Sequence, residues 1–520
     1  MLRKAHLTGT GSPFKIFLRT MVLTEIEAPE MPPCDYVPNP YKGHRSSPPL
    51  SKNNSMYAIA LGILEGLEYE KILKVKKEHI VPCIQPYYKK PLLIHEGHMQ
   101  WLFDHTGRRY LDMFGGIVTV CAGHSHPKIN EEIFKQMKTL WHTTNIYLHP
   151  RLYEYAEKLT AKLPGDLKVV YFVNSGSEAN DLAMLLARLY TKNYDIISFR
   201  NGYHGMSPYC MAITGLSIWR YDLPISMGVH HAMNPDVYRG LWGGSKCRDS
   251  PVQTDRTCDC EGDCEAADHY YNQLEEVFKY SLPRGKVAAL FAESIQGVGG
   301  VIQFPKGFLK KAFELIRSNG GICVSDEVQS GFGRTGETFW GFESHKVVPD
   351  IVTMAKGIGN GYPLAAVITT SKIAATLGHA NHFNTFGGNP IACSAGIATL
   401  DVIEEEKLQD NCKKIGTYLL KNLAKLRDEF EIVGDVRGKG LMIGVEMIKK
   451  KSTKEPLSAK RFADIWEDCK DMGLLVGRGG LNSHVMRIKP PMCITKRDAD
   501  FTVEVLRTAI KKNIEKCSAH

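Results

Sequence analysis

The amino-acid sequence predicts an α/β fold, in which short buried strands alternate with helices. Two runs carry this prediction, Ile322-Cys323-Val324 and Ile351-Val352-Thr353-Met354. Both are rich in β-branched residues, have the length of a strand and are bounded by Gly or Pro, which is typical of strands buried on both faces. An ionisable residue stands just past the end of each run, Asp326 after the first and Lys356 after the second. Because ligands bind at the carboxyl edge of open α/β sheets, this edge is the candidate functional site.

The composition is that of a globular protein with two or three domains. The chain has 520 residues, of which 43% are hydrophobic and 23% charged, and its net charge is +9. These proportions exclude a disordered scaffold. No run reaches the roughly 18–20 apolar residues of a membrane span. No basic stretch has the interleaved aromatic residues of a nucleic-acid groove. We therefore expect small anionic substrates as partners, and neither a nucleic acid nor a membrane.

The first 30 residues have the pattern of a mitochondrial targeting segment. Basic residues occur from Arg3 onward, and no acidic residue precedes Glu25. A helix beginning at Ser12-Pro13 would carry its apolar side chains on one face and its basic side chains on another. We therefore predict a mitochondrial protein whose residues 1–30 direct import, followed by a Pro-rich arm over residues 31–76.

Residues 100–200 predict a hairpin, two helices and a strand that runs directly into a third helix. The hairpin turns at 105–108, the helices cover 130–139 and 151–163, and a buried strand covers 169–173. Ser175, with Glu178 three residues on, forms a capping box that starts a helix at Gly176. The first turn of such a helix has unpaired amides at the positive end of its dipole, so it suits a phosphate. A capped helix without a ligand is the alternative.

Two more strands release polar groups where they end. The strand over 196–199 leads to Tyr203 and His204, and the strand over 288–292 leads to Glu293. An aromatic ring between glycines can stack on a flat heterocycle. Together with Lys356 and Asp326, these groups suit pyridoxal phosphate, whose aldehyde bonds to a lysine and whose ring nitrogen pairs with a carboxylate.

A second function has a sequence signal as well. Residues 331–336, GFGRTG, match the G-x-G-x-x-G pattern of dinucleotide-binding folds, so an NAD-dependent oxidoreductase is the alternative from another class. No helix is expected to open after Gly336, which weakens this alternative. Taken singly, Asp326 and Lys356 also have a plainer interpretation as turn or surface residues.

The C-terminal third predicts helices over 410–430 and 458–472, a strand pair over 437–446, and a final helix capped by Thr495 and Asp498. Arg487 stands inside a strand pattern, where an unpaired charge is costly. It is a candidate clamp for a substrate carboxylate, and a surface arginine on an edge strand is the alternative. Thr385 and the glycines after it form another loop suited to an anion.

The cysteines predict reduced thiols in an intracellular protein. The chain has 14 of them, most spread thinly through predicted strands and helices. Four stand together in a polar loop, Cys247, Cys258, Cys260 and Cys264. Their spacing lacks the paired C-x2-C of zinc sites, so we predict no metal and a surface loop with free or paired thiols, with zinc as the alternative.

Five motifs together resemble the class III, ornithine-type aminotransferases of pyridoxal-phosphate fold type I. They are NSGSEAN at 174–180, NGYHG at 201–205, DEVQSGFGRTG at 326–336, MAKGIGNGYP at 354–363 and NTFGGNP at 384–390. The resemblance implies a large domain over 126–395, built on a mostly parallel sheet with helices on both faces. It also implies a smaller α+β domain formed by 77–125 and 396–512. Against the family pattern, residues 44–67 are an insertion in the arm.

The resemblance implies transfer of an amino group from alanine, or another small or ω-amino acid, to glyoxylate or another 2-oxo acid. A phospho-lyase or aminomutase of the same class is the alternative. Lys356 and Asp326 are then catalytic, and Glu293 and Arg487 form a switchable pair that binds the substrate. Thr385 is implied to reach the neighbouring subunit's cofactor, so we expect a homodimer with shared sites or a tetramer built from it. The implied cofactor contacts are Ser175, Gly176, Ser177, Tyr203, His204, Glu293, Asp326, Val328, Gln329, Lys356 and Thr385.

Overall fold

The computed structural model describes residues 27–43, 64–225, 227–244, 246–254 and 264–518. Most of the predicted targeting segment and most of the predicted insertion lie outside these residues, as do Cys258 and Cys260. On either side of residues 44–63, two short strands pair in parallel, β1 (Tyr41–Gly43) and β2 (Leu64–Gly66). The helix α2 (Tyr69–His79) follows.

The large part of the molecule is built on a seven-stranded sheet with the order β6-β12-β11-β10-β9-β7-β8. Its strands are β6 (Val169–Val173), β7 (Ile196–Phe199), β8 (Val229–Ala232), β9 (Ala289–Glu293), β10 (Ile322–Asp326), β11 (Ile351–Met354) and β12 (Ala365–Thr369). Neighbouring strands from β8 to β11 pair in parallel, and β12 alone runs antiparallel to both of its neighbours. The prediction of a mostly parallel sheet is therefore confirmed.

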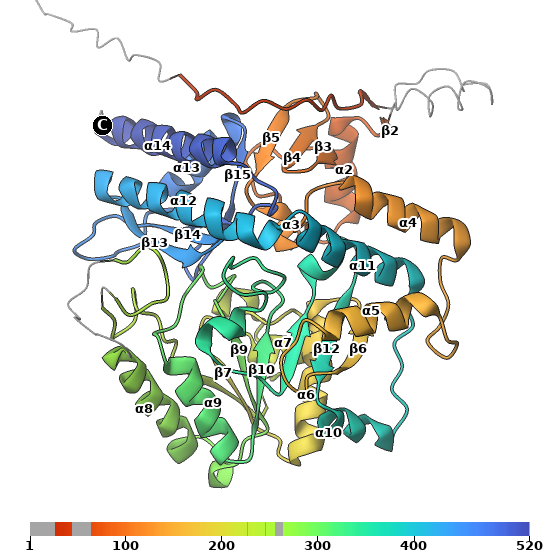
Figure 1. Cartoon of the computed structure of the whole chain (residues 1–520). Helices are drawn as coiled ribbons and strands as arrows, with labels where there is room; N and C mark the ends of the chain where they lie inside the picture. The colour runs from red at the N-terminus through yellow and green to blue at the C-terminus, as the bar shows by residue number, and fades with distance from the viewer. Residues whose placement is uncertain (1–26, 44–63, 226, 245, 255–263, 519–520) are drawn as a thin grey trace, which may run out of the picture.

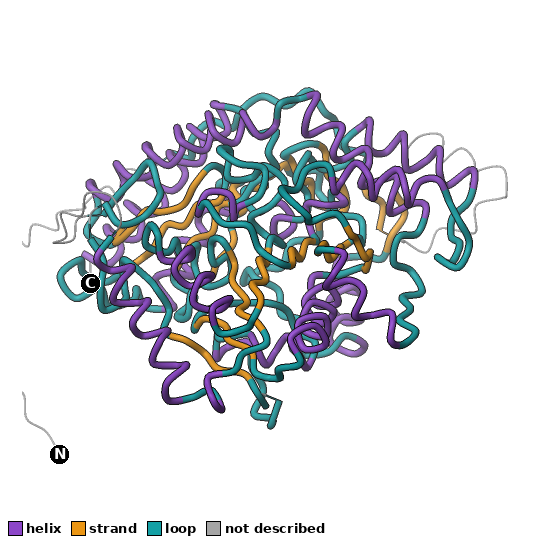
Figure 2. The backbone as a smooth tube through the Cα atoms, turned by 60° about the horizontal axis from the view of Figure 1, so that its bottom comes forward, coloured by secondary structure: helices purple, strands orange, loops and turns teal. Residues whose placement is uncertain are grey.

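Helices cover both faces of this sheet, because successive side chains of a strand point to opposite sides. Ile322 and Val324 pack in one hydrophobic cluster with residues of α6 (Gly176–Thr191). Cys323, between them, belongs to another cluster with Phe313 of α9 (Phe308–Ser318). Figure 2 shows the strands in the interior with helices outside them. The strand at 169–173 was predicted to be buried, but the first three residues of β6 are only partly buried because β6 is an edge strand.

The smaller part combines segments from both ends of the chain. A four-stranded antiparallel sheet has the order β13-β14-β17-β16, with bounds Val433–Lys439, Met442–Met447, Val485–Ile488 and Gly477–Gly479. A second sheet joins β3 (Ile94–His98), β4 (Trp101–Asp104) and β5 (Arg109–Asp112) to β15 (Leu474–Leu475). The hairpin β4–β5 was predicted, and the pairing of β5 with β15 brings the two predicted small-domain segments together. The domain boundaries themselves stay a prediction.

The helices of the smaller part are α12 (Leu408–Glu429), α13 (Ala459–Asp471) and α14 (Lys496–Ser518). Thr495 and Asp498 form the predicted cap of α14, since each accepts a hydrogen bond from the backbone amide of the other. The other helices are α3 (Gly115–Val118), α4 (Pro127–Thr139), α5 (Pro150–Thr160), α7 (Pro208–Ile213), α8 (Glu265–Tyr280), α10 (Ser371–Ala374) and α11 (Pro390–Glu405). Among the described residues, no helix is long and apolar enough to cross a membrane.

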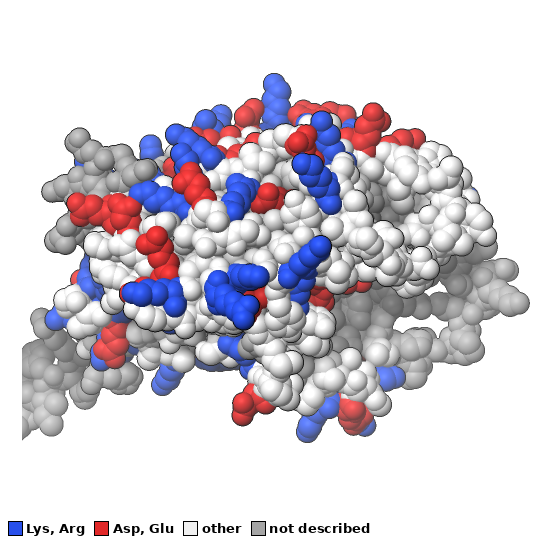
Figure 3. Space-filling model, turned by 90° about the horizontal axis from the view of Figure 1, so that it is seen from below, with Lys and Arg blue, Asp and Glu red and all other residues white. Residues whose placement is uncertain are grey.

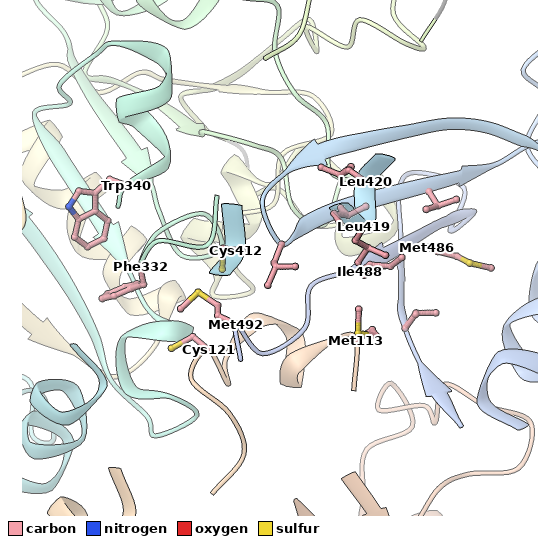
Figure 4. Close-up of a cluster of buried hydrophobic side chains, with 14 of the residues drawn as sticks. Met113, Cys121, Phe332, Trp340, Cys412, Leu419, Leu420, Met486, Ile488 and Met492 are labelled. Atoms are coloured by element: carbon pink, nitrogen blue, oxygen red, sulfur yellow. The ribbon is translucent and has the colours of Figure 1, made fainter. Parts of the chain in front are cut away.

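One hydrophobic core connects the two parts. Figure 4 shows Phe332 and Trp340, from the loop after β10, at one end of a cluster that runs through Met492 to Met486 and Ile488 of β17. These side chains are almost completely buried. Because the core is continuous, β17 is held rigidly against the carboxyl edge of the large sheet.

Candidate active site

The predicted carboxylates and lysine meet at the carboxyl edge of the large sheet. In the strand register, Asp326 at the end of β10 lies opposite Glu293 of β9 on one side and Thr353 of β11 on the other. Lys356 follows two residues after the end of β11. Both carboxylates are almost fully buried. The sheet thus brings together groups that are up to 63 positions apart in the sequence, from Glu293 to Lys356.

Asp326 is held as a buried anion by a network of hydrogen bonds. Its Oδ2 accepts from His204 Nδ1 at 2.8 Å and from Asn180 Nδ2 at 2.9 Å, and its Oδ1 accepts from the Val328 amide at 3.1 Å. Burial alone would raise the pKa of Asp326, but the hydrogen bond and charge of His204 outweigh it, so the pKa lies below its usual value. Burial would lower the pKa of His204, but the hydrogen bond and charge of Asp326 outweigh this effect and raise it. Both shifts favour an ion pair in which His204 Nδ1 donates to Asp326.

Asn180 and Thr353 belong to this network and were not predicted. Asn180 Nδ2 also donates to the carbonyl of His204 at 2.8 Å, and Asn180 Oδ1 accepts from Thr353 Oγ1 at 2.7 Å. Asn180 lies on α6, four residues after Gly176, so it is on the same face of the helix as the predicted phosphate turn. That spacing is the sequence signal that could have found it.

Lys356 has an unusual backbone and a depressed amine pKa. It begins a 3-10 turn (Lys356–Gly359) with φ of 54°, a left-handed conformation that non-glycine residues rarely adopt and that is often found at functional sites. Burial lowers the pKa of its amine, and the opposing effects of Asp326 and Glu293 do not restore it. No carboxylate forms an ion pair with Lys356 within the described residues. A lysine with a lowered pKa is prepared to act as a nucleophile or a base.

The predicted phosphate turn has the expected cap. Ser175 Oγ accepts from the amide of Glu178 at 3.2 Å, and α6 begins at Gly176. The Glu178 carboxylate accepts from the amide of Asn174 at 2.7 Å, one residue before the cap position, and from Ser175 Oγ at 3.3 Å, rather than from the amide of Ser175. The backbone is packed closely here, since a Cβ on Gly205 would lie 2.4 Å from Ser177 Oγ. The first turn of α6 thus offers free helix amides in a tight cradle suited to a phosphate.

On the inner side of this turn, Val328 lies across Gly176. A Cβ added to Gly176 would lie 3.2 Å from both methyl groups of Val328. The predicted contact residue Val328 is therefore next to the predicted phosphate turn. Ser175 and Thr385 are exposed, unlike the other candidates. The loop of Thr385 is tied to the same region through Asn384, whose Oδ1 accepts from Asn174 Nδ2 at 2.9 Å.

Arg487 is buried in the middle of a sheet, which excludes the interpretation as a surface arginine on an edge strand. β17 lies between β14 and β16, and Arg487 is 2% exposed. Its Nε donates to the carbonyl of Arg478 at 2.9 Å and its guanidinium lies 5.1 Å from the ring centre of Phe114, but its buried Nη1 has no partner among the described residues. Burial lowers its pKa to about 10, which leaves it charged at neutral pH. An unpaired guanidinium nitrogen aimed into a site is suited to an anionic ligand.

The predicted pair of Glu293 and Arg487 is not joined in this structure. Glu293 accepts from the amides of Tyr203 at 3.1 Å and Gly297 at 2.7 Å, and no ion pair within the described residues links it to Arg487. Tyr203 makes an edge contact with Trp219, with ring centres 5.3 Å apart. Trp219 had no sequence signal, because a lone aromatic in a loop cannot be assigned to a site.

Two other predictions have clear outcomes. The GFGRTG segment forms turns, and no α-helix opens after it; a short 3-10 helix (Gly341–His345) follows four residues later. Arg334 of the segment is buried in the core, where it donates to the carbonyls of Leu441 and Pro490. The segment therefore does not form a phosphate-binding loop. Cys247 and Cys264 form a disulfide, so of the alternatives for the cysteine loop the one with paired thiols holds for these two residues. No group of three or more metal-binding side chains occurs in the described residues.

Comparison with known proteins identifies the family. The model of the family described as aminotransferase class-III matches residues 84–510. The chain belongs to the class-III aminotransferase family. This aminotransferase is 55% identical over 490 residues to "Alanine--glyoxylate aminotransferase 2, mitochondrial" of Homo sapiens, an alignment that covers 94% of this chain and 91% of the human protein.

Solved structures agree with this assignment. The fold is similar to that of an aminotransferase from Bacillus anthracis, with a TM-score of 0.77, 32% identity, and coverage of 86% of this chain and 100% of the other. It is also similar to a phospholyase from Arthrobacter in complex with phosphoethanolamine, with a TM-score of 0.75, 31% identity, and coverage of 84% and 99%. This aminotransferase therefore has pyridoxal-phosphate fold type I, and its family implies pyridoxal phosphate as the cofactor.

The residues of the aminotransferase fit that cofactor chemically. A helix N-terminus in a tight cradle suits the phosphate, a buried anionic carboxylate suits a protonated ring nitrogen, and a lysine without an ion pair suits an aldehyde. The three features line one edge of the sheet, on α6, β10 and the turn after β11.

Proposed function

We propose that this protein transfers the amino group of alanine, or of another small or ω-amino acid, to glyoxylate or another 2-oxo acid. The observation that carries the proposal is the 55% identity to the human alanine–glyoxylate aminotransferase 2 along nearly the whole of both chains. The unpaired, buried Nη1 of Arg487 supports it, because both substrates offer a small carboxylate.

The residues proposed to hold the cofactor follow from their chemistry. The amides of Gly176 and Ser177 and the Ser175 cap bind its phosphate, with Thr385 contributed by the neighbouring subunit. Asp326 binds the ring nitrogen, and Val328 and Tyr203 contact the ring faces. When bound, pyridoxal phosphate supplies a ring that accepts the electrons released at the substrate Cα.

Lys356 acts as the proton carrier. Burial lowers the pKa of its amine, so a larger fraction of it is unprotonated at neutral pH than of an ordinary lysine. The free amine removes a proton from the substrate Cα and delivers it to the cofactor carbon that receives the amino group. The left-handed backbone of Lys356 fixes the direction from which the amine approaches.

Asp326 keeps the ring nitrogen of the cofactor protonated. His204 and Asn180 donate to Asp326 Oδ2, which orients the carboxylate and stabilises its negative charge. An anionic carboxylate in a site of low dielectric holds a cationic partner more strongly than it would in water. His204 and Asn180 therefore act through Asp326.

Arg487 binds the substrate α-carboxylate through its free Nη1. Glu293 is proposed to pair with Arg487 when an amine-terminated side chain enters. Its present hydrogen bonds to the amides of Tyr203 and Gly297 would then be exchanged for that ion pair. This switch lets one site accept both an amino acid and an ω-amino acid.

A phospho-lyase is the second candidate, because the Arthrobacter phospholyase has a similar fold. The two functions differ in their products. An aminotransferase passes the amino group to the 2-oxo acid, so alanine is consumed over many turnovers only when glyoxylate is present. A phospho-lyase releases ammonia and phosphate from phosphoethanolamine without any acceptor. Assays for glycine, ammonia and phosphate on the same preparation distinguish them.

We propose a homodimer with shared active sites. Two segments that lie near the phosphate turn carry large exposed apolar side chains, which a partner subunit would cover: Trp141, Ile146, Tyr147, Leu148, Phe383 and Phe386. Figure 3 shows one face of the molecule, on which Lys and Arg are interspersed with Asp and Glu. This mixed pattern differs from the continuous basic stripe of a nucleic-acid-binding protein.

Mixing subunits tests the shared site. Lys356→Ala and Thr385→Ala subunits are each defective, but a hybrid of the two has one site with both wild-type residues. Recovery of activity on mixing, under conditions where subunits exchange, supports the shared site. No recovery although hybrids are detected by mass spectrometry contradicts it.

We also propose that the protein acts in mitochondria, as the name of the human relative suggests. A fluorescent fusion of the whole chain should enter mitochondria, and the same fusion without residues 1–30 should not. Import of the shortened fusion would overturn the assignment of this segment.

The central experiment is the visible spectrum of the purified protein. Cofactor absorbance should be present, should change on addition of alanine and should return on addition of glyoxylate. Reduction with borohydride followed by peptide mapping should find the cofactor on Lys356. A label on another lysine, or no change with alanine, would reject the proposal.

A further inference from the structure

A second lysine, Lys489, is buried at the same site and has no role in the function described so far. It follows directly after β17, and its side chain is 0% exposed. Its Nζ donates to Gln329 Oε1 at 2.9 Å, and no carboxylate forms an ion pair with it within the described residues. Because fully buried lysines are almost always paired with a carboxylate, this one calls for a functional explanation.

The backbone fixes the direction of Lys489. Met486 and Ile488 of β17 point into the hydrophobic cluster of Figure 4. Since side chains alternate along a strand, Arg487 and Lys489 point to the opposite side, towards the active site. The amide of Lys489 donates to the carbonyl of Met113 at 2.8 Å, which anchors it just beyond the strand.

The charges around Lys489 come from the active site. Burial lowers the pKa of its amine well below the usual value, Arg487 and Lys356 lower it further, and Glu293 opposes them. Lys489 is thus in electrostatic contact with the residues proposed to bind the substrate and the cofactor. A purely structural lysine would be expected to have a carboxylate beside it.

Gln329 is held between Lys489 and a glycine. It is almost fully buried, and a Cβ on Gly297 would lie 2.4 Å from its Oε1 and 2.7 Å from its Nε2. The amide therefore packs flat on the backbone of Gly297. An amide group can be turned over without changing its shape, so its orientation depends on its hydrogen-bond partners. In this structure Lys489 Nζ donates to the amide oxygen of Gln329, which leaves the amide nitrogen to donate to another group.

We propose that Lys489 is a positioning residue that turns the Gln329 amide so that its Nε2 donates to the phenolic oxygen of pyridoxal phosphate. This inference rests on the proposed function, in which pyridoxal phosphate binds at this site, and on Gln329 as one of the implied cofactor contacts. A donor at this place stabilises negative charge on the phenolic oxygen. The oxygen then competes less well for the proton that it shares with the nitrogen bonded to Lys356. The loaded enzyme consequently loses that proton at a lower pH.

The test replaces Lys489 by methionine in the full-length protein. Methionine keeps most of the length and apolar character of the lysine stem but cannot donate. We expect the pH midpoint of the visible absorbance of the loaded enzyme to rise by about one pH unit. We expect cofactor binding, measured by titrating the apoprotein, to weaken about 5- to 10-fold. An unchanged midpoint and unchanged binding would overturn the proposal.

A double variant asks whether Lys489 acts through Gln329. Gln329→Leu should raise the midpoint by a similar amount, and Gln329→Leu combined with Lys489→Met should raise it no further. If the two shifts add, Lys489 acts independently of Gln329, and the positioning role is wrong. Lys489→Gln, whose amide can still donate, should keep the midpoint close to that of the wild type.

Two controls separate this role from a structural one. Lys470→Met removes a buried lysine that is paired with Glu467 and lies in α13, so it should lower the melting temperature without moving the midpoint. Lys489→Met should leave the melting temperature of the apoprotein unchanged or higher, because it removes an unpaired buried cation. If Lys489→Met does not fold, Lys489→Gln and Lys489→Leu take its place, and equal midpoints for these two would overturn the proposal. Absence of cofactor absorbance in the wild type would instead reject the proposed function.

Discussion

Around Asp435 the buried charges are matched by opposite charges, whereas around Lys356 the buried cations have no carboxylate partner. The paired cluster consists of Arg248, Asp435, Arg437 and Glu446, each at most 2% exposed. Arg248 binds both oxygens of Asp435, at 2.7 and 2.9 Å, and Arg437 lies 3.0 Å from Asp435 and 2.5 Å from Glu446. The site cluster consists of Lys356, Arg487 and Lys489, and no ion pair within the described residues involves any of the three.

The difference separates a structural use of charge from a functional one. In the paired cluster, the protein itself supplies the opposite charges that offset the cost of burial. In the site cluster no carboxylate of the described residues offsets that cost, and a ligand can bring the missing negative charge. A phosphate-bearing cofactor and a carboxylate substrate are ligands of this kind. The comparison therefore predicts opposite responses to mutation in the two clusters.

The largest effect is expected for Lys356→Ala, which should lower activity about 10⁴-fold or more because the proton carrier is lost. The apoprotein should keep its melting temperature or gain a little, since a desolvated cation is removed. Steady-state assays and calorimetry measure the two quantities. Lys470→Ala is the matched control, which should keep activity and lose stability. Turnover by Lys356→Ala at a tenth of the wild-type rate would break the comparison.

Asp435→Asn should have the reverse pattern. Two arginines would lose their shared partner, and the free energy of unfolding should fall by about 3–5 kcal/mol. Activity per folded molecule should stay unchanged, because the paired cluster does not touch the reacting groups. Denaturant titration and assays at low temperature test this. A loss of activity without a loss of stability would show that Asp435 has a functional role like that of the residues in the site cluster.

Arg487→Lys is expected to cost less. A lysine cannot form the planar, two-pronged contact of an arginine with a carboxylate. Transition-state binding should weaken by about 2–4 kcal/mol, or about 30- to 1000-fold in kcat/KM for alanine and glyoxylate. The cofactor absorbance should persist, because Arg487 is not a cofactor residue. An equal kcat/KM for variant and wild type would mean that another residue binds the carboxylate.

The smallest effects are expected from pH, and they should appear at opposite ends of the scale. Burial would raise the pKa of Glu446, but Arg437 outweighs this effect and holds the pKa at about 2. The contribution of Glu446 to stability is therefore present above its usual pKa and is lost as the pH falls towards 2. The pKa of His204 is raised by Asp326, so the contribution of His204 is present below its usual value and lost as pH rises through the raised one.

Both contributions concern the stability of the apoprotein. Melting curves against pH should show an acid slope that Glu446→Gln flattens and an alkaline slope that His204→Gln flattens. The more stringent test is whether each variant leaves the other slope unchanged: Glu446→Gln should not alter the alkaline slope of melting temperature against pH. If one variant flattened both slopes, the two clusters would not be independent.

Much of the site could be predicted from local sequence. The apolar runs before Glu293, Asp326 and Lys356 have strand length and composition; the first two strands end at the site residue itself, and the third ends two residues before Lys356. The cap at Ser175 follows from the spacing of Ser175 and Glu178 alone. These features depend on residues that are close in the chain, so the sequence contains them directly.

Other features depend on contacts between distant segments. The disulfide between Cys247 and Cys264 was one of several open alternatives for the cysteine loop. The role of Asn180 depends on Asp326, which is 146 positions away, and the role of Lys489 depends on Gln329, which is 160 positions away. The sequence shows that Arg487 and Lys489 alternate with apolar residues. Only the partners that each side chain has in the folded protein distinguish a site residue from an ordinary surface charge.

The sequence by itself determined the α/β class, the strands that lead to the site, the family motifs and the polar groups that follow those strands. These follow from hydrophobic periodicity and from capping, which act over a few residues. The tertiary structure decided which charges are paired and which are left without a partner. That distinction depends on the register of β9, β10 and β11 and on the docking of β17 against them. Pairing of charges depends on distance in space, and the core that fixes those distances forms only when both ends of the chain come together.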